Sequence, residues 1–238
     1  MGPDGGVHLL VSLSGLGPGA PLAAAVDCCD ALDARRVPLT LLVGPRPHPE
    51  VAAFAAARRR AGDAVLLRGF RSVHDDARPY RRLPVLEARL RLAGATRSAE
   101  ALGLEADGFA APGWSVSDGT RRALAEAGLG VLLDDIGVHR LGPDGVPTAG
   151  AAGPVVRPGE AAPSFAGIRR GGRRRGEPGM RHLTVDVTIG TGALVAAVDL
   201  ALADGAVPDV PAGLVGPGRR PRRPAGGTLD PELWSTTA

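Results

Sequence analysis

The chain has 238 residues, 44% of them hydrophobic and only 3% aromatic, enough for one sizeable core filled mainly by leucine, valine and alanine. All 28 basic residues are arginines, and nine of them stand in two acid-free runs at 169–175 and 219–223, so the formal net charge of +3 leaves the rest of the chain acidic. No aromatic residue interleaves these runs, which we therefore expect to be solvated segments, and we expect no nucleic-acid surface.

The sequence also gives expectations about compartment and membranes. The first residues lack a basic segment followed by an apolar one, so we expect no signal peptide. The longest apolar candidate, residues 193–203, contains Asp199, so we expect no membrane span. Cys28 and Cys29 are adjacent, a spacing that forms neither a disulfide framework nor a zinc site. We expect two buried thiols and a cytoplasmic location, where thiols stay reduced.

Short apolar runs alternate with helix-forming segments along most of the chain. We expect strands at 7–14, 37–43, 64–67, 107–111, 129–133 and 182–187. We expect helices at 21–36, 49–61, 84–102, 118–127 and 191–203, with Leu86, Leu90 and Ala93 of the third facing the core. Strands that alternate with helices on short loops predict a parallel sheet, in an α/β barrel or a doubly wound fold.

The C-terminal third is less regular. We expect one domain over residues 1–207. Within it, residues 142–179 are dense in glycine, proline and arginine, which predicts a loop with at most a short strand at 154–157. Residues 208–238 are rich in proline and glycine, which predicts a disordered tail.

A proline, a glycine and a tryptophan follow the fourth expected strand. Pro112 has no N–H to donate, and Gly113 allows a sharp turn, so Trp114 is expected at the mouth of the strand. Ser117 or Asp118 is expected to cap the next helix. Two interpretations of Trp114 stay open: it lines a site at the rim, or it plugs the core beneath a loop.

In either fold class, functional groups gather at the C-terminal ends of the strands. The candidate ligand-binding residues there are Ser14, Arg68, Arg71, His74, Trp114, Asp134, Asp135 and Asp186. A rim with arginine and tryptophan side chains predicts an anionic or sugar ligand, with the ring stacking on it and the guanidinium groups pairing with it.

Several of these segments together resemble a known family. They are residues 9–13, the second expected strand at 37–43, residues 67–70, the Ala-Pro-Gly-Trp stretch at 111–114 followed by Ser117, and the end of the fifth expected strand. In their order and spacing, over about residues 7–204, the chain resembles the polysaccharide deacetylase-like proteins with a NodB-type barrel. More closely, it resembles a bacterial branch of that group with degenerate metal motifs and no assigned function.

The resemblance implies an α/β fold, a distorted (β/α) barrel of the polysaccharide deacetylase type. Active relatives use a water bound to zinc or another divalent ion to hydrolyse an N-acetyl group on a sugar. A carboxylate acts as base, while an aspartate and two histidines bind the ion. Such a set polarises the amide carbonyl and makes water nucleophilic at neutral pH.

This chain departs from that pattern at most chemical positions. The paired acids expected after the first strand fall on Ser14 and Gly15, and the His-Gly-Tyr-x-His element falls on the Arg-Gly-Phe-Arg-Ser of residues 68–72. The histidine of a late strand aligns with Asp186. Coulomb repulsion between an arginine and a metal cation about 4 Å apart would disfavour binding of the ion by several kcal/mol at an effective dielectric constant of about 20. We therefore expect a retained scaffold, no bound metal, and lost or altered hydrolysis.

Two alternatives stay open beside a non-catalytic carbohydrate- or anion-binding protein. His74, Asp75 and Asp76 follow the missing element and could rebuild a metal site with the other acids. The Gly-Leu-Gly-Pro-Gly-Ala sequence at 15–20 fits a dinucleotide-binding loop, although residues 43–46 lack the acid that would bind the ribose.

The remaining histidines are expected to have structural roles. His8 and His182 are expected to be strand residues with satisfied hydrogen bonds, and His48 and His139 to be surface loop residues.

Overall fold

The computed structural model describes residues 6–70, 77–153, 155–157 and 179–215. Within them the strands are β1 (His8–Leu16), β2 (Leu39–Val43), β3 (Ala64–Leu67), β4 (Gly108–Ala110), β5 (Val131–Leu133), β6 (Gly137–Leu141), β7 (Pro147–Ala152), β8 (Val155–Val156), β9 (Met180–Asp186) and β10 (Val207–Asp209). The helices are α1 (Leu22–Asp33), α2 (Pro49–Arg60), α3 (Val85–Glu100), α4 (Asp118–Glu126), α5 (Gly192–Ala203) and α6 (Pro211–Val215), with a 3-10 turn at Pro112–Trp114.

These strands form one sheet with β1 near its middle. Its order is β7-β6-β5-β4-β3-β2-β1-β9-β8, and β10 also pairs with β1. Strands β1 to β5 run parallel because each is followed by a crossover helix, whereas β5, β6 and β7 pair antiparallel. Strand β9 pairs with one edge of β1, and β10 and β2 share the other edge.

The segment after β7 closes the sheet into a distorted barrel. Ala152, the last residue of β7, bridges in parallel to Gly179, which precedes β9. Strand β8 then pairs with His182 and Leu183 of β9. Residues 147–156 therefore join β6 to β9, and the two ends of the sheet meet. This confirms the fold class expected from the resemblance.

The core has two apolar parts. The larger lies between the sheet and the helices and includes both cysteines. The smaller fills the barrel interior with inward-facing residues, as a closed barrel requires, and its main members are Leu10, Leu42, Leu66, Ala110, Trp114, Leu133, Val138, Ala151, Met180 and Leu214. Burial raises the pKa of Cys28 to about 11 and the pKa of Cys29 further, so both are inert thiols, in agreement with the expectation that they are buried.

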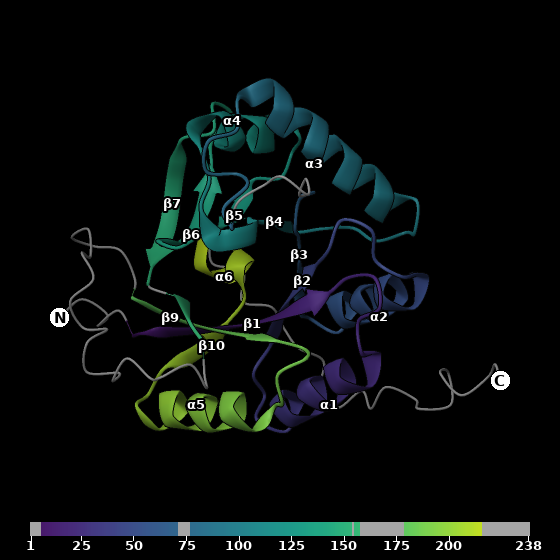
Figure 1. The fold of residues 1–238 in the computed structure, drawn as a ribbon. Helices are drawn as coiled ribbons and strands as arrows, with labels where there is room; N and C mark the ends of the chain where they lie inside the picture. The colour runs from purple at the N-terminus through teal and green to yellow at the C-terminus, as the bar shows by residue number, and fades with distance from the viewer. Residues whose placement is uncertain (1–5, 71–76, 154, 158–178, 216–238) are drawn as a thin grey trace.

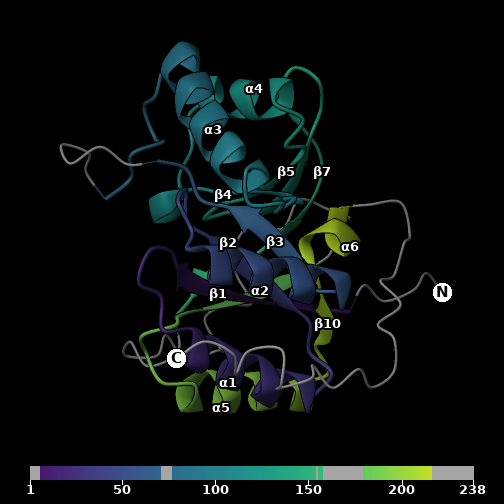
Figure 2. The same ribbon diagram turned by 90° about the vertical axis from the view of Figure 1, so that its right-hand side faces the viewer.

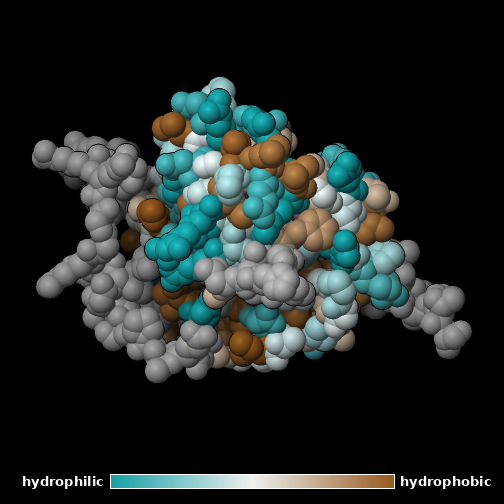
Figure 3. Space-filling view, turned by 45° about the horizontal axis from the view of Figure 1, so that its top comes forward, coloured by the Kyte–Doolittle hydropathy of each residue, from teal (hydrophilic) through white to brown (hydrophobic). Residues whose placement is uncertain are grey.

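The helices cover the sheet in two groups. Figures 1 and 2 both place α1 beside α5 at one side of the sheet and α3 beside α4 at the other. Arg35, two residues after the end of α1, donates to Asp199 of α5 at 2.6 and 3.0 Å, which ties the first pair together. In Figure 3, where the side of α3 and α4 comes forward, apolar residues are scattered among hydrophilic ones.

A buried ion cluster fixes the turn between α2 and β3. The Arg58 side chain is 1% exposed, and its guanidinium binds Asp33 at 2.8 and 2.9 Å and Asp63 at 2.5 Å. Asp63 also accepts from the backbone N–H of Leu39 at 2.9 Å, which aligns β2 with this turn. Burial alone would lower the pKa of Arg58, but the two carboxylates outweigh it and raise that pKa.

Three local expectations are wrong. Residues 137–152 form the β6–β7 hairpin, where a loop was expected from residue 142 onward. Residues 207–215 form β10 and α6, so the ordered fold continues into the segment expected to be a disordered tail. On α3, Leu86 and Leu90 are 64% and 67% exposed, while Ala88, Leu92, Ala95 and Ala99 face the core.

The remaining expectations concern membrane spans and the two arginine runs. In the described residues, no helix is both long enough and apolar enough to cross a bilayer. The arginine runs at 169–175 and 219–223, and the rest of the expected tail from 216 on, lie outside the described residues.

Candidate functional site

A cleft of about 860 Å³ opens at the C-terminal ends of the parallel strands. Six strands supply its walls, because the chain leaves β1, β2, β3, β4, β8 and β9 at this same end of the barrel. The polar and aromatic side chains around it are those of Ser14, Arg46, Arg68, Phe70, Trp114, Arg157, Thr184 and Asp186.

The turn after β4 places Trp114 in this cleft. Gly113 adopts φ +73°, and a Cβ there would lie 2.1 Å from the carbonyl oxygen of Ala77, so this position requires glycine. Trp114 itself has φ +61°, an uncommon value for a bulky residue. Its carbonyl accepts from the backbone N–H of Asp135 at 2.8 Å, which holds the turn against the end of β5.

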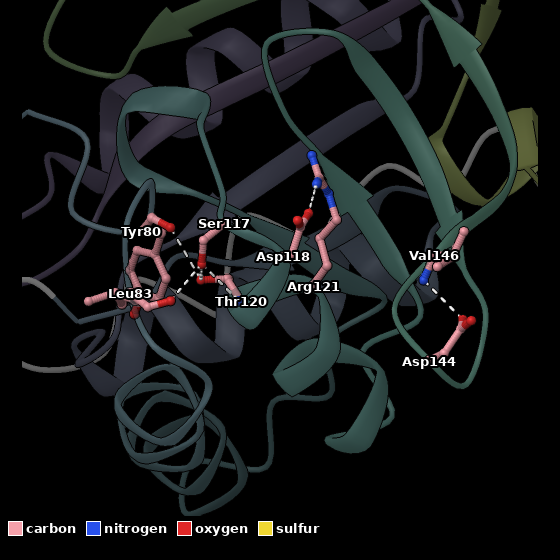
Figure 4. Close-up of polar contacts among 8 residues, drawn as sticks. All are labelled: Tyr80, Leu83, Ser117, Asp118, Thr120, Arg121, Asp144 and Val146. Atoms are coloured by element: carbon pink, nitrogen blue, oxygen red, sulfur yellow. Dashed lines mark hydrogen bonds and ion pairs between the residues drawn. The ribbon is translucent and has the colours of Figure 1, made fainter.

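The next residues anchor this turn to the segment before α3, as Figure 4 shows. Ser117 caps α4 by accepting from the N–H of Thr120 at 3.0 Å, as expected from the sequence, and donates to the carbonyl of Leu83 at 2.7 Å. Thr120 donates to the carbonyl of Tyr80 at 3.2 Å. The Trp114 turn is therefore fixed on both sides before any ligand binds.

Arg68, Trp114 and His182 form a stack from the cleft into the barrel. The Arg68 guanidinium carbon lies 5.2 Å from the centre of the Trp114 ring, and one Nη donates to the carbonyl of Ala111 at 3.3 Å. On the barrel side, the ring of His182 meets Trp114 edge to face at 5.2 Å. Trp114 is 7% exposed. It thus fills the barrel interior and also lines the cleft, so both interpretations of this residue hold.

Ser14 and Asp186 meet at the opposite wall. The Ser14 hydroxyl lies 3.2 Å from Oδ2 of Asp186, and the backbone N–H and hydroxyl of Thr188 donate to Oδ1 at 3.1 and 2.8 Å. Burial of Asp186 opposes ionisation, but these hydrogen bonds and the charge of Arg68 outweigh it, and the pKa of the carboxyl lies below its usual value. Asp186 is therefore an ionised acceptor that is already engaged.

Gly15 lies directly against this carboxylate. Its φ is +86°, and a Cβ built there would stand 2.7 Å from Oδ1 of Asp186 and 2.8 Å from Val187. The space that a side chain at position 15 would need is therefore occupied by Asp186 and its neighbour.

Below the cleft, the barrel interior holds a small polar layer. Ser12 Oγ lies 2.8 Å from Nε2 of His182 and donates to Thr184 Oγ1 at 2.9 Å. All three side chains are buried. Among the described residues, Nδ1 of His182 and Oγ1 of Thr40 have no hydrogen-bond partner. The expectation of satisfied hydrogen bonds is thus wrong for one of the two ring nitrogens of His182, whose pKa burial lowers to about 3.

The structure brings four of the expected site residues together: Ser14, Arg68, Trp114 and Asp186 all line the cleft. Asp134 and Asp135 do not line it. The Asp134 carboxylate serves its own turn, accepting from the N–H groups of Ile136 and Gly137 and from His139 Nε2 at 2.9 Å. Arg71 and His74 lie outside the described residues, as do Asp75 and Asp76.

The other histidines differ from expectation in part. His139 was expected to be a surface loop residue, but it is a half-buried residue of strand β6. His8 on β1 lies 3.2 Å from Asp209 of β10. His48 is exposed, in agreement with the expectation, and caps α2 by accepting from the N–H of Glu50.

Two further arginines line the cleft: Arg46, which stands at a strand end in the sequence but is not among the candidate ligand-binding residues, and Arg157, which sequence reasoning missed. Arg46 follows β2, and its guanidinium lies 5.1 Å from the centre of the Phe70 ring. Arg157 follows β8, in a segment expected to be mostly loop. For Arg46 the signal was its position just after a buried strand, where the neighbouring Gly44 also lines the cleft. For Arg157 the signal was weak, because β8 is only two residues long.

The residues of this site do not fit a divalent ion. The resemblance places metal ligands and the base at Ser14, Gly15 and residues 68–72, where the structure offers a hydroxyl, a glycine without room for a side chain, and the cation Arg68. Over the described ranges, no three His, Cys, Asp or Glu side chains stand close enough to hold a metal ion.

The structure agrees with the dinucleotide-binding interpretation only in where it places the glycine loop. Gly15 and Gly17 line the cleft before α1, but β2 ends at Val43 and is followed by Gly44, Pro45 and Arg46, so the ribose-binding acid is missing there.

Neither the scan of protein-family models nor the search of curated proteins finds a match for the chain. Solved structures do match. A candidate polysaccharide deacetylase from Mycobacterium smegmatis has a TM-score of 0.55 at 18% identity, over 87% of this chain and 88% of that one. A CE4 family pseudoenzyme from Bacillus anthracis has a TM-score of 0.51 at 15% identity, over 83% of this chain. A mutant of the same protein has a TM-score of 0.56 at 16% identity, over 84% of this chain.

The chain spans 59% of the length of the pseudoenzyme structure and 64% of its mutant. At these identities the likeness establishes the fold, and it agrees with the strand order, the barrel closure and the cleft at the C-terminal strand ends. The chain therefore has the polysaccharide deacetylase-like, NodB-type fold of these CE4 proteins.

Proposed function

We propose that the chain binds a carbohydrate in this cleft and does not hydrolyse N-acetyl groups through a bound metal ion. The observation that carries the proposal is the wall formed by Ser14, Gly15 and Asp186. An acid at position 15 would collide with the side chains of Asp186 and Val187, so the change from the deacetylase pattern involves the space beside Asp186 as well as residue identity.

The cleft otherwise suits a sugar. Its volume of about 860 Å³ is in the range of small-molecule sites, about 300–1,000 Å³. The rings of Trp114 and Phe70 and the polar groups of Ser14 and Thr184 face the same space. Aromatic faces and hydrogen-bonding side chains are the two features that a sugar ring can use at once.

The structural neighbours are compatible with this proposal but do not decide it. One is described as a CE4 family pseudoenzyme, which is said of that protein and of a chain longer than this one. It nevertheless provides a precedent for this fold without the activity of the enzymes.

The test measures metal content and acetate release on the same purified, full-length protein. Substoichiometric zinc, manganese and cobalt by mass spectrometry, together with no acetate from N-acetylglucosamine oligomers in added zinc, would support the proposal. One tightly held ion per chain with metal-dependent acetate release would overturn it.

The binding arm uses the same protein and a panel of mono- and disaccharides, neutral, N-acetylated and acidic. A rise in melting temperature that grows with sugar concentration is expected for at least one class, because a ligand that binds only the folded state stabilises it by mass action. If no sugar of any class shifts the melting temperature or gives heat on titration, carbohydrate binding is refuted.

A further inference from the structure

We propose that the ligand of the cleft carries an acid group, a sugar carboxylate or a sugar phosphate, and that Arg46, Arg68 and Arg157 bind it. This inference rests on the proposed carbohydrate-binding function and specifies its substrate class. The rim of the cleft would then bind an anion at the place where the resemblance implies a metal cation.

The balance of charges around the cleft favours an anion. Three arginines, one each from the segments after β2, β3 and β8, face the cavity, whereas Asp186 is the one acidic residue among its described lining. Asp186 already accepts from Ser14 and Thr188. Over the described lining, three guanidinium groups therefore face one carboxylate in a partly enclosed space.

Two of the guanidinium groups lie against aromatic rings. Arg68 lies over Trp114 at 5.2 Å and Arg46 over Phe70 at 5.1 Å. A ring beneath a guanidinium restrains its long side chain and leaves N–H groups at its edge for a ligand. Less conformational entropy is then lost when an acid group binds. Carboxylate and phosphate are the groups that this planar fork binds in a bidentate manner.

The same geometry explains why a neutral sugar is the weaker ligand. Each guanidinium that faces the cavity loses some hydration when a ligand fills it, and a hydroxyl returns only a neutral acceptor. An ionised oxygen gives a charge-assisted hydrogen bond, which is roughly twice as strong as a neutral one. The neutral isostere of an acidic sugar is therefore expected to bind at least about tenfold more weakly.

The experiment compares ligands that differ at one carbon. Isothermal titration of the full chain would use methyl β-glucuronide, its neutral counterpart methyl β-glucoside, and methyl β-glucoside 6-phosphate, each at low and at raised salt. The glucuronide or the phosphate, or both, should bind at least about tenfold more tightly than the glucoside, and raised salt should weaken only the acidic ligands. The glucuronide and phosphate arms distinguish the two sources of the acid group.

Arginine variants assign the site. Arg46→Gln removes an exposed guanidinium at the rim and should weaken the acidic ligand about tenfold, a larger loss than for the glucoside, which offers only neutral acceptors. Arg60→Gln is the matched control, because Arg60 is an exposed arginine in the last turn of α2, outside the cleft lining. Arg68→Gln is a second variant of the same kind, because it removes the guanidinium that lies over the Trp114 ring.

The outcomes separate the two proposals. Equal affinities for glucoside and glucuronide, or equal losses in Arg46→Gln and Arg60→Gln, would overturn the acid-group inference and leave carbohydrate binding intact. Failure of every sugar to bind, or metal-dependent acetate release, would overturn the proposed function itself.

Discussion

Substitution of His182 by glutamine should remove a pH dependence that the barrel interior builds into the stability of the protein. His182 is fully buried, and one ring nitrogen has Ser12 as its partner while the other has none among the residues that the structure describes. Burial lowers the pKa of this imidazole from 6.5 to about 3, because the charged form cannot be hydrated inside the barrel. Glutamine keeps a polar group near Ser12 but does not titrate.

The direction and the size of this pH dependence follow from the linkage between proton binding and folding. Between pH 3 and pH 6.5 the unfolded chain binds a proton at His182 and the folded chain does not, so the free energy of unfolding falls as the pH is lowered through this window. One pKa unit corresponds to about 1.4 kcal/mol. From pH 6.5 to pH 4.5 the loss assigned to this residue is therefore about 2 kcal/mol, and it is absent in His182→Gln.

Urea denaturation of both proteins at several pH values between 4.5 and 6.5 measures this difference. Carboxylates titrate in the same window, but they are common to both proteins and cancel when the two curves are subtracted. The wild-type curve should lose about 2 kcal/mol more than the variant curve on acidification. Parallel curves for the two proteins would mean that His182 is hydrated or gains a proton without cost, which would refute the buried neutral imidazole.

Three further substitutions test the scaffold by the same denaturation assay. Asp63→Ala should cost about 3–5 kcal/mol because it leaves the buried Arg58 without its closest carboxylate; a cost below about 1 kcal/mol would contradict that burial. Gly69→Ala should cost about 1–3 kcal/mol, since its Cβ would stand 1.8 Å from the Tyr80 hydroxyl, and an unchanged midpoint would show that Tyr80 moves freely. Trp114→Ala should cost about 3–5 kcal/mol and also weaken ligand binding, while loss of binding alone would make this residue only a rim residue.

The regular part of the fold could be predicted because each apolar run is short and is followed by a helix. The strands β1 to β5 and β9 all lie where the sequence indicates them. The β6–β7 hairpin could not be predicted, because Pro147–Ala152 is made of proline, glycine, alanine and threonine and has no alternating apolar pattern. It forms because its backbone pairs with β6 and closes the barrel, which is a tertiary effect.

Helix α3 shows a different limit of sequence patterns. It contains two apolar stripes at helical spacing, one led by Leu86 and Leu90 and the other by Ala88 and Leu92. Periodicity alone favours neither, and the leucine-richer stripe was expected to be buried. The structure buries the stripe that is richer in alanine, and Ala88, Leu92 and Ala99 pack into the larger apolar core.

The candidate site was only partly predictable for a related reason. Ser14, Arg68, Trp114 and Asp186 follow or end recognisable strands, so the topology places them at one rim. Asp134 also ends a strand, but it accepts from backbone N–H groups of its own turn. Position in the sequence specifies the end of the barrel at which a residue lies. It does not specify whether the side chain faces the cleft or serves the local turn.

The division between scaffold and rim explains how such a barrel can keep its fold while its site chemistry changes. The groups that hold the barrel together are the apolar interior and the buried ion pair of Arg58 with Asp63, all nearly inaccessible to solvent. The groups that differ from the deacetylase pattern, Ser14, Gly15 and Arg68, are half-buried or exposed at the strand ends. Substitutions at such positions change stability little compared with changes in the core. The side chains of the rim can therefore change without loss of the fold, and it is the rim rather than the barrel that must be tested to learn what this protein binds.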